Sequence, residues 1–364
     1  MKRLCLVLRS RTWWWLPCAW VAATAVAAPC TTAAPACTEW VVPTDGPSHS
    51  LVYRTYPLET RNENITRALV VVHGAQRDAD NYFRHVLAAA FLADALEDTV
   101  IVSPRFASNN GKACRDSLGP DEINWNCLAG PDGWRTGGGA VDNGKITTFD
   151  VADTILRKLA RKEVFPNLKK IVVAGHSAGG QFVTRYEMSN QVHDGLGVEI
   201  VYVVANPSSY AYPDGLRPTA SALPATVAAT APGYHPPAAA NPAEPFVAFS
   251  DARNCSTYDQ WPYGFQQRAG YGARIADDVL KKQLAARPTT YLLGELDILP
   301  LYGFDASCPA MAQGPTRLAR GLAFGRYVNE KYGAQHKTVV VPACGHSARC
   351  MFTADVTLPL IFPK

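Results

Sequence analysis

A serine flanked by glycines is the residue in this chain that is best placed to do chemistry. The run Gly175-His176-Ser177-Ala178-Gly179 fits G-x-S-x-G, a pattern that places a nucleophilic serine on a sharp turn between a strand and a helix. The apolar run 171–174 before it predicts a buried parallel strand, and residues 181–189 have a composition compatible with a helix. The alternative is a glycine-rich turn without chemistry. We expect Ser177 to be a nucleophile held in a strained backbone conformation.

A serine nucleophile requires a base, and the base requires an acid that orients it. On a parallel sheet these partners lie just after later strands, in the chain order serine, acid, histidine. His346 follows the apolar run 337–341, which predicts the last strand, so it is the expected base. The rival His336 lies before that run, at the wrong end of the strand.

The acid is expected after the preceding strand, which the run 289–293 predicts. Asp297 follows that run and is the expected partner of His346. Glu295 is a nearby rival, but it lies in the turn itself. Asp251, after the predicted strand 246–249, is a more distant rival. A loop carboxylate or a helix cap without a catalytic role is the alternative interpretation of Asp297.

A tetrahedral intermediate also needs hydrogen-bond donors for its oxyanion. One expected donor is the backbone amide of Ala178, the residue after the nucleophile. The other is expected after the predicted strand that ends at His73-Gly74, where the amide of Ala75 is the first choice and that of Gln76 the second. His73 itself is interpreted as structural.

Together these motifs resemble the α/β-hydrolase superfamily. The resemblance covers roughly residues 66–350 and rests on four motifs in order, namely His73-Gly74, Gly175 to Gly179, Gly294-Glu295-Leu296-Asp297 and Gly345-His346. It is closer to secreted hydrolases of poorly defined substrate that pair Gly-His-Ser-Ala-Gly-Gly-Gln-Phe with Asn-Pro-Ser-Ser-Tyr, here Asn206 to Tyr210. The resemblance implies an α/β fold with a mostly parallel, eight-stranded sheet, helices on both faces, and a serine-esterase mechanism without a cofactor. Ala75-Gln76 departs from the family pattern, in which more glycines follow His-Gly.

The remaining segments suggest one hydrolase domain preceded by an export signal. Residues 1–28 combine a basic start, an apolar stretch and small residues for cleavage, which predicts a signal peptide. Residues 29–48 are expected to be a loose leader, and residues 49–364 the hydrolase domain. The Ala- and Pro-rich segment 206–245 is expected to be a lid or insertion. The polar, Gly-rich segment 109–144 is a long loop of the kind that is usually functional.

Charge and cysteine content fit an exported protein. Four of the 35 Lys and Arg residues lie in the predicted signal, so 31 remain against 31 Asp and Glu residues. A protein without net charge gives no reason to expect nucleic-acid binding. We expect secretion, extracellular or periplasmic, without stable membrane insertion after cleavage. Eight cysteines would remain, and although 105 pairings are possible, proximity suggests four: Cys30–Cys37, Cys114–Cys127, Cys255–Cys308 and Cys344–Cys350. No C-x-x-C or H-E-x-x-H motif indicates zinc.

The sequence therefore predicts a secreted serine hydrolase of carboxylic esters, acting on a small-molecule or polymeric substrate. A serine peptidase or amidase on the same triad is the main alternative, because both reactions pass through an acyl-enzyme. A binding module without catalysis is a further alternative. Six aromatic residues could form a rim for a polymer, although ordinary packing is the preferred interpretation for most of them: Trp125, Trp134, Tyr210, Tyr212, Trp261 and Tyr263.

Overall fold

The computed structural model describes residues 28–112, 114–219, 245–301 and 303–364. The expected signal peptide, apart from Ala28, lies outside the described residues, and so does the greater part of the expected insertion 206–245. Within the described part of the chain, no helix has the length and apolar character needed to cross a membrane.

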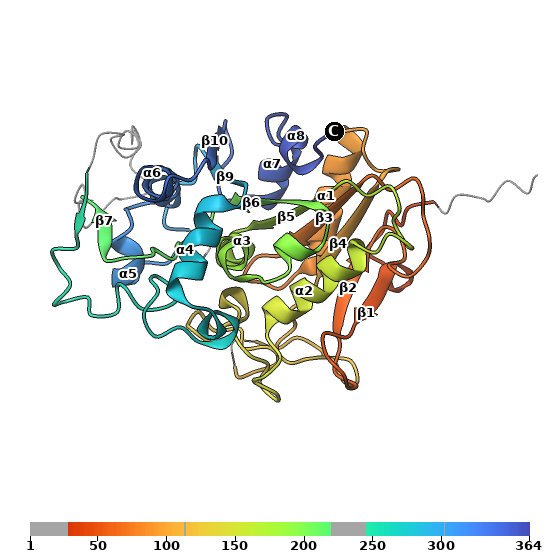
Figure 1. Cartoon of the computed structure of the whole chain (residues 1–364), viewed down its shortest axis with the longest axis horizontal. Coiled ribbons are helices and arrows are strands. Elements are labelled where there is room, and N and C mark those ends of the chain that lie inside the picture. Colours follow the sequence, from red (N-terminus) through yellow and green to blue (C-terminus); the bar gives the residue numbers. More distant parts are fainter. Residues whose placement is uncertain (1–27, 113, 220–244, 302) are drawn as a thin grey trace, which may run out of the picture.

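A central eight-stranded sheet organises the described chain, in the spatial order β1-β2-β4-β3-β5-β6-β9-β10 (Figure 1). Its first two neighbour pairs are antiparallel and the other five are parallel, as the predicted fold class requires. The strands are β1 (Thr38–Val41), β2 (Ser50–Arg54), β3 (Arg67–Val72), β4 (Thr99–Pro104), β5 (Lys170–His176), β6 (Glu199–Ala205), β9 (Thr289–Gly294) and β10 (Lys337–Val341).

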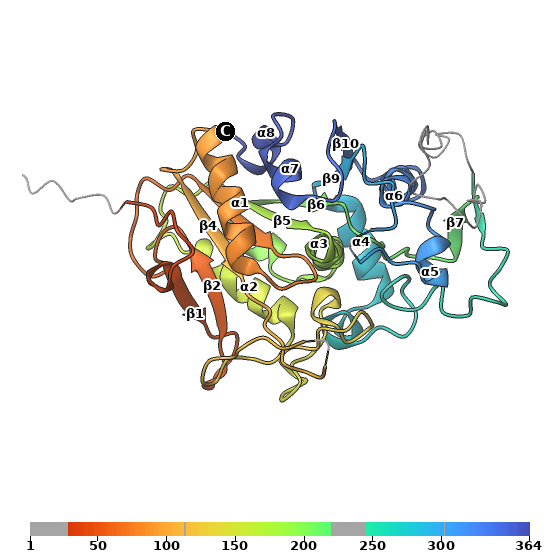
Figure 2. The ribbon, with the colours of Figure 1, turned by 180° about the vertical axis from the view of Figure 1, so that it is seen from behind.

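Helices cover both faces of this sheet, which confirms the expected layering. The α-helices are α1 (Ala79–Leu92), α2 (Thr148–Leu159), α3 (Ala178–Ser189), α4 (Asp277–Ala286), α5 (Cys308–Met311), α6 (Arg317–Tyr332), α7 (Ala348–Thr353) and α8 (Leu358–Ile361). Helices α2, α3, α4 and α6 lie on one face (Figure 1), and α1, α7 and α8 lie on the other (Figure 2). The side chains of the two groups belong to two separate cores.

The central strands are buried on both faces, so their side chains divide between two cores. In β3, Val70 and Val72 join the core under α2 and α3, whereas Leu69 and Val71 join the core under α1. This alternation follows from the period of two along a strand. It explains why β3 and β5 read as continuous apolar runs in the sequence.

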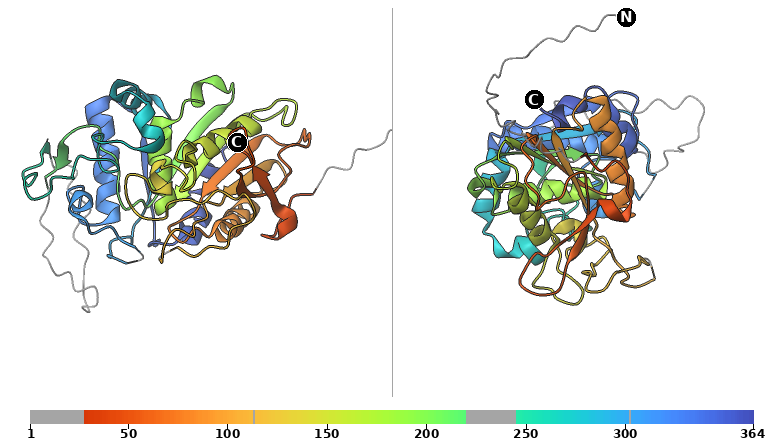
Figure 3. Two further views of the ribbon diagram at one scale, coloured as in Figure 1. Left: turned by 90° about the horizontal axis from the view of Figure 1, so that it is seen from below. Right: turned by 90° about the vertical axis from the view of Figure 1, so that its right-hand side faces the viewer.

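The expected leader 29–48 is partly wrong, because residues within it belong to the sheet. β1 pairs with β2 at one edge, far from α6, as Figure 3 shows. Val41 is buried there, and Glu39 forms an ion pair with Arg54 of β2 at 3.2 Å. The ring of Trp40 lies 4.1 Å from that of His49. These contacts are made with residues beyond the segment, and its Pro-, Thr- and Ala-rich composition gave no sign of them.

The predicted closing strand 246–249 is also wrong as a part of the central sheet. Phe246–Ala248 forms β8, which pairs in antiparallel fashion with β7 (Leu216–Pro218) in a separate two-stranded sheet. Val247 and Ala248 are exposed, so this run lacks the two buried faces of a central strand. Asp251 therefore does not follow a strand of the central sheet.

The four disulfides that sequence proximity suggests are all present. Their Cα–Cα distances are 5.6, 6.3, 5.8 and 5.7 Å in chain order, within the usual range for a disulfide. Cys114–Cys127 closes the long loop between β4 and α2, and Cys344–Cys350 closes the loop that carries His346. Disulfides of this number are typical of proteins that fold in an oxidising compartment.

Candidate active site

Ser177 stands on a strained turn between β5 and α3, as the sequence predicts. Its φ and ψ are 59° and −119°, an unusual backbone conformation for a residue with a side chain. A Cβ on Gly175 would lie 2.3 Å from the Gly179 carbonyl oxygen, and one on Gly179 would lie 2.1 Å from the Val72 oxygen. Only glycine at both positions allows α3 to start this close to β3 and β5.

His346 contacts Ser177 at the carboxyl ends of the parallel strands. The His346 Nε2 atom lies 2.9 Å from Ser177 Oγ, although the two residues are 169 positions apart in the chain. His346 follows β10, whose register against β9 brings the end of the strand to Gly294. The loop that carries the histidine is closed by the disulfide Cys344–Cys350.

Asp297 completes the line of hydrogen bonds. Its Oδ2 atom accepts a hydrogen bond from His346 Nδ1 at 2.7 Å, and its Oδ1 atom accepts one from Arg317 Nη1 at 3.2 Å. The carboxylate is buried, and the guanidinium of Arg317 supplies a charge of opposite sign beside it. Because a carboxylate only accepts, the Nδ1 proton of His346 points at Asp297, and the lone pair of Nε2 then accepts the hydrogen bond of the Ser177 hydroxyl.

The rival candidates make other contacts. Glu295 is exposed, and its Oε2 atom accepts a hydrogen bond from the Ala343 amide at 2.8 Å. His336 bonds through Nδ1 with the Tyr291 hydroxyl at 2.9 Å, and burial lowers its pKa to about 4. Asp251 accepts a hydrogen bond from the Asn254 side chain at 2.6 Å, in the loop after β8.

Two further histidines are buried at the ends of β3 and β5. His176 is buried. Its burial, and to a smaller extent the charge of the neighbouring His346, lowers the pKa of His176 well below the ordinary value. Its Nδ1 atom lies 3.0 Å from the Tyr82 hydroxyl. His73 bonds through Nδ1 to the Gly74 carbonyl at 2.9 Å and accepts the Phe106 amide at Nε2 at 3.0 Å. Both contacts are to backbone, in agreement with a structural role for His73.

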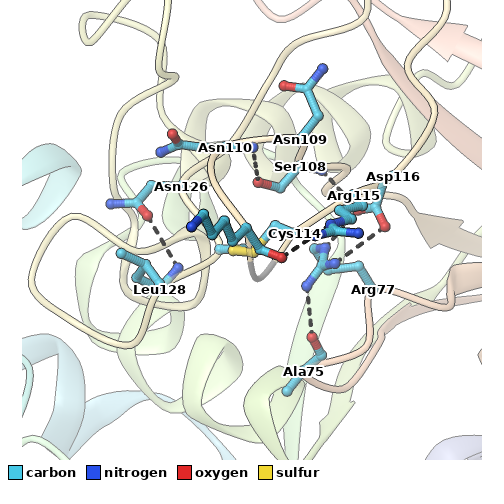
Figure 4. Close-up of a disulfide and its surroundings, with 12 residues drawn as sticks. Ala75, Arg77, Ser108, Asn109, Asn110, Cys114, Arg115, Asp116, Asn126 and Leu128 are labelled. Atoms are coloured by element: carbon cyan, nitrogen blue, oxygen red, sulfur yellow. Dashed lines mark hydrogen bonds and ion pairs between the residues drawn. A yellow bond between two sulfur atoms is a disulfide. The ribbon is translucent and has the colours of Figure 1, made fainter.

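Ala75 and Ala178 both line the pocket that contains Ser177. Ala178 is the first residue of α3, and Ala75 lies in the turn after β3. Arg77 holds this turn: its backbone N–H donates to the Gly74 carbonyl at 3.1 Å, and its Nη1 donates to the Ala75 carbonyl at 3.0 Å (Figure 4). Since a trans peptide points its N–H away from its C=O, these bonds fix the directions of the Ala75 and Gln76 amides.

The pocket beside Ser177 has a volume of about 260 Å³. The long loop between β4 and α2 forms one wall through Ala129, Gly130, Arg135 and Thr136. Tyr263 is the only one of the six candidate rim aromatics that lines this pocket. The other five are buried in the protein interior, which confirms that most of them serve packing. A second hollow of about 340 Å³, lined by Leu296, Leu299 and Leu301, lies on the His346 side.

Sequence reasoning missed three arginines and a glutamine near the site. Arg317 contacts Asp297, and Arg135, Gln181 and Arg185 line the Ser177 pocket. Gln181 and Arg185 follow Ser177 by one and two turns of α3, so helical spacing could have found them. No local signal marked Arg135 or Arg317. The described residues contain no cluster of His, Cys, Asp and Glu that could hold a metal ion.

Comparisons with known proteins agree with this fold. The family described as "Alpha/beta hydrolase family" matches residues 69–356. Among solved structures, LpqC, a poly(3-hydroxybutyrate) depolymerase from Bordetella parapertussis, is similar at 21% identity and a TM-score of 0.56, over 89% of this chain and 90% of that one. Poly(aspartic acid) hydrolase-1 from Sphingomonas sp. KT-1 is similar at 20% identity and a TM-score of 0.54, over 89% and 97%. No curated protein matched the sequence.

Proposed function

Because this chain belongs to the alpha/beta hydrolase family, we propose that it is a serine hydrolase of carboxylic esters with Ser177, His346 and Asp297 as its triad. The observation that carries the proposal is the unbroken line of hydrogen bonds from Ser177 Oγ through His346 to Asp297, at 2.9 and 2.7 Å. This line starts at a strained serine that faces a pocket. Such an arrangement activates a hydroxyl that would otherwise be a weak nucleophile.

In the proposed reaction, Ser177 Oγ attacks the acyl carbon while its proton moves to His346 Nε2. The imidazolium that forms is stabilised by Asp297, which itself stays ionised. The amides of Ala178 and Ala75 donate to the developing oxyanion. The intermediate then expels the alcohol, which takes the proton from His346, and leaves an acyl-enzyme. Water repeats the sequence at the acyl carbon and releases the acid, so the proton balance closes without a cofactor.

A peptidase or amidase reaction is the second candidate on the same triad. The observation that favours it is the likeness to a poly(aspartic acid) hydrolase, which equals the likeness to a poly(3-hydroxybutyrate) depolymerase within 0.02 in TM-score (0.56 against 0.54). We favour esters because an alkoxide leaves a tetrahedral intermediate more readily than an amide anion does. An ester therefore depends less on proton donation to its leaving group. We propose a small-molecule or polymeric ester as the substrate, and the four disulfides support export.

The test is labelling of the purified protein with a fluorophosphonate, beside Ser177→Ala and His346→Ala. We expect labelling of the wild type and its loss in both variants. Acyl esters of rising chain length and a matched anilide then separate an esterase from an amidase. A folded wild type that resists the probe and hydrolyses none of these substrates would favour a binding module instead.

A further inference from the structure

Two guanidinium groups and one carboxylate lie on the wall of the pocket that contains Ser177. Arg135 comes from the short 3-10 helix 134–136 in the long loop, and Arg185 comes from α3. Asp305 comes from the segment before α5. Within the described chain neither arginine forms an ion pair with a carboxylate. The pocket wall therefore carries two positive charges and one negative charge.

Each side-chain nitrogen of Arg185 has a neutral partner. Its Nε and Nη2 donate to the Pro262 carbonyl at 3.1 and 2.6 Å, and its Nη1 donates to the Gln181 carbonyl at 2.8 Å. Nη2 also lies 3.2 Å from Ser209 Oγ. These bonds fix the side chain in place but leave its charge without a counterion. Arg185 thus makes the pocket electropositive without being free to move toward a ligand.

Arg135 is held far more weakly. Its two hydrogen bonds, from Nη1 to Gln181 Oε1 and from Nη2 to the Cys127 carbonyl, are both 3.4 Å long. Its Nε atom is buried and has no hydrogen-bond partner among the described residues. A buried charged donor left in this state costs free energy, because it has lost water and gained little in return. A carboxylate in the pocket would offer the two Nη atoms acceptors better than the two long contacts they now have.

Asp305 does not neutralise this pair. Its Oδ2 accepts a hydrogen bond from the Tyr263 hydroxyl at 2.8 Å, and its Oδ1 accepts one from the Ser307 amide at 3.0 Å. Burial lowers the pKa of Arg135 to about 10 and that of Arg185 to about 9, so both are protonated at neutral pH. One positive charge stays uncompensated beside the nucleophile.

We propose that Arg135 binds a carboxylate on the substrate, so that the hydrolase prefers esters whose acyl or alcohol part carries a negative charge. The inference rests on the proposed function of Ser177. Gln181, the partner of Arg135, follows Ser177 by one helical turn, about 5.4 Å along the axis. The carboxylate of the substrate would therefore be separated from the scissile carbonyl by a few carbon atoms. The planar fork of arginine suits two-point contact with a carboxylate.

The test compares monoethyl esters of dicarboxylic acids that have two, three or four methylene groups with the same esters in which a carboxamide replaces the free carboxylate. Each pair differs in charge and hardly in size. For the preferred length in the wild type, we expect kcat/KM to be about ten- to a hundredfold higher for the carboxylate, the usual value of a charged hydrogen bond. In Arg135→Gln this ratio falls toward one, and in Arg135→Lys it takes an intermediate value. Arg84→Gln, an exposed arginine on α1, is the matched control and keeps the wild-type ratio.

Protection experiments keep the proposal testable if Arg135→Gln fails to fold. Free glutarate should slow fluorophosphonate labelling of the wild type at a concentration at least about tenfold lower than its monoamide does. The proposal is overturned by a wild-type ratio of one or less at every length, by an unchanged ratio in folded Arg135→Gln, or by equal protection from the two compounds. If the enzyme is labelled and cleaves neutral esters, these results leave the proposed function standing. If labelling and hydrolysis survive in Ser177→Ala, the proposed function itself fails.

Discussion

Arg77 and Asp116 form a two-point ion pair, with Nε 2.6 Å from Oδ2 and Nη2 3.2 Å from Oδ1. This pair joins the turn after β3 to the long loop that lines the Ser177 pocket (Figure 4). Asp116 also accepts the Ser108 amide at 2.8 Å, and it lies two residues after Cys114 of the Cys114–Cys127 disulfide. The third nitrogen of Arg77 holds the Ala75 carbonyl. The turn that carries the proposed oxyanion donor is therefore held by a loop that is itself cross-linked.

We expect Arg77→Met to lower kcat about ten- to a hundredfold with little change in KM. The Ala75 carbonyl would lose its side-chain donor, so the turn that carries the Ala75 and Gln76 amides would no longer be held toward the oxyanion. Asp116→Asn should have the same effect in weaker form. Steady-state kinetics on a neutral ester measures both. Arg84→Met removes a comparable ion pair on the exposed surface of α1 and should leave kcat unaltered. An unaltered kcat in folded Arg77→Met would contradict this role.

Asp297→Asn should slow fluorophosphonate labelling by about 10³- to 10⁴-fold, because an amide at this position no longer fixes the His346 proton on Nδ1. Glu295→Gln is the matched control, since Glu295 lies two residues earlier and contacts the Ala343 amide instead. Its labelling rate should stay within about threefold of the wild type, as for other surface changes. Equal losses of labelling rate in Asp297→Asn and Glu295→Gln would contradict the assignment of Asp297, rather than Glu295, as the acid.

Gly179→Ala should destabilise the fold by about 3 kcal/mol or more, because its Cβ would overlap backbone that cannot move aside. The overlap is with the Val72 carbonyl oxygen at 2.1 Å. Gly144→Ala is the control, since a Cβ there meets no atom within 4 Å. Urea denaturation followed by circular dichroism measures both. Similar midpoints for the two variants would show that the β3–α3 approach is less tight than this distance implies.

Acid should destabilise the protein through His73. Burial lowers its pKa to about 4 from 6.5. Between these values the unfolded chain binds a proton that the folded chain does not, so the free energy of unfolding falls as the pH falls through this window. From pH 7 to pH 5 the contribution is about 2 kcal/mol. In His73→Gln the difference in unfolding free energy between these two pH values should shrink by about that amount. An unchanged difference would mean that His73 titrates normally.

Local patterns were sufficient to predict the residues that the structure brings together. Ser177, Asp297 and His346 each follow a buried apolar run, and parallel strands place their carboxyl ends at one edge of a sheet. The catalytic roles of the three stay a prediction. The role of the glycines around Ser177 could also be predicted, because only glycine allows a strand and the following helix to approach each other so closely.

Other parts of the site could not be predicted, because they depend on contacts between distant segments. Arg77 and Asp116 are 39 residues apart, and no sequence pattern near either residue predicts their ion pair. Arg135 lies in an irregular loop without hydrophobic periodicity, so its place in the pocket follows only from the folded loop. The run Phe246–Ala248 had the composition of a strand, but its neighbours decided which sheet it joined. Helix α4 (Asp277–Ala286) was also missed, since only Leu280 and Leu284 of it are buried.

The two contacts of His346 join parts of the chain that are 169 and 49 residues apart. Between β5 and β9, the strands that precede Ser177 and Asp297, lies β6, so the two residues reach one place only after three neighbouring strands have paired. Contacts between such distant residues form late, because long chain segments must first be ordered. During refolding, the return of hydrolysis will therefore report the completion of the sheet, and it will trail the return of helical signal.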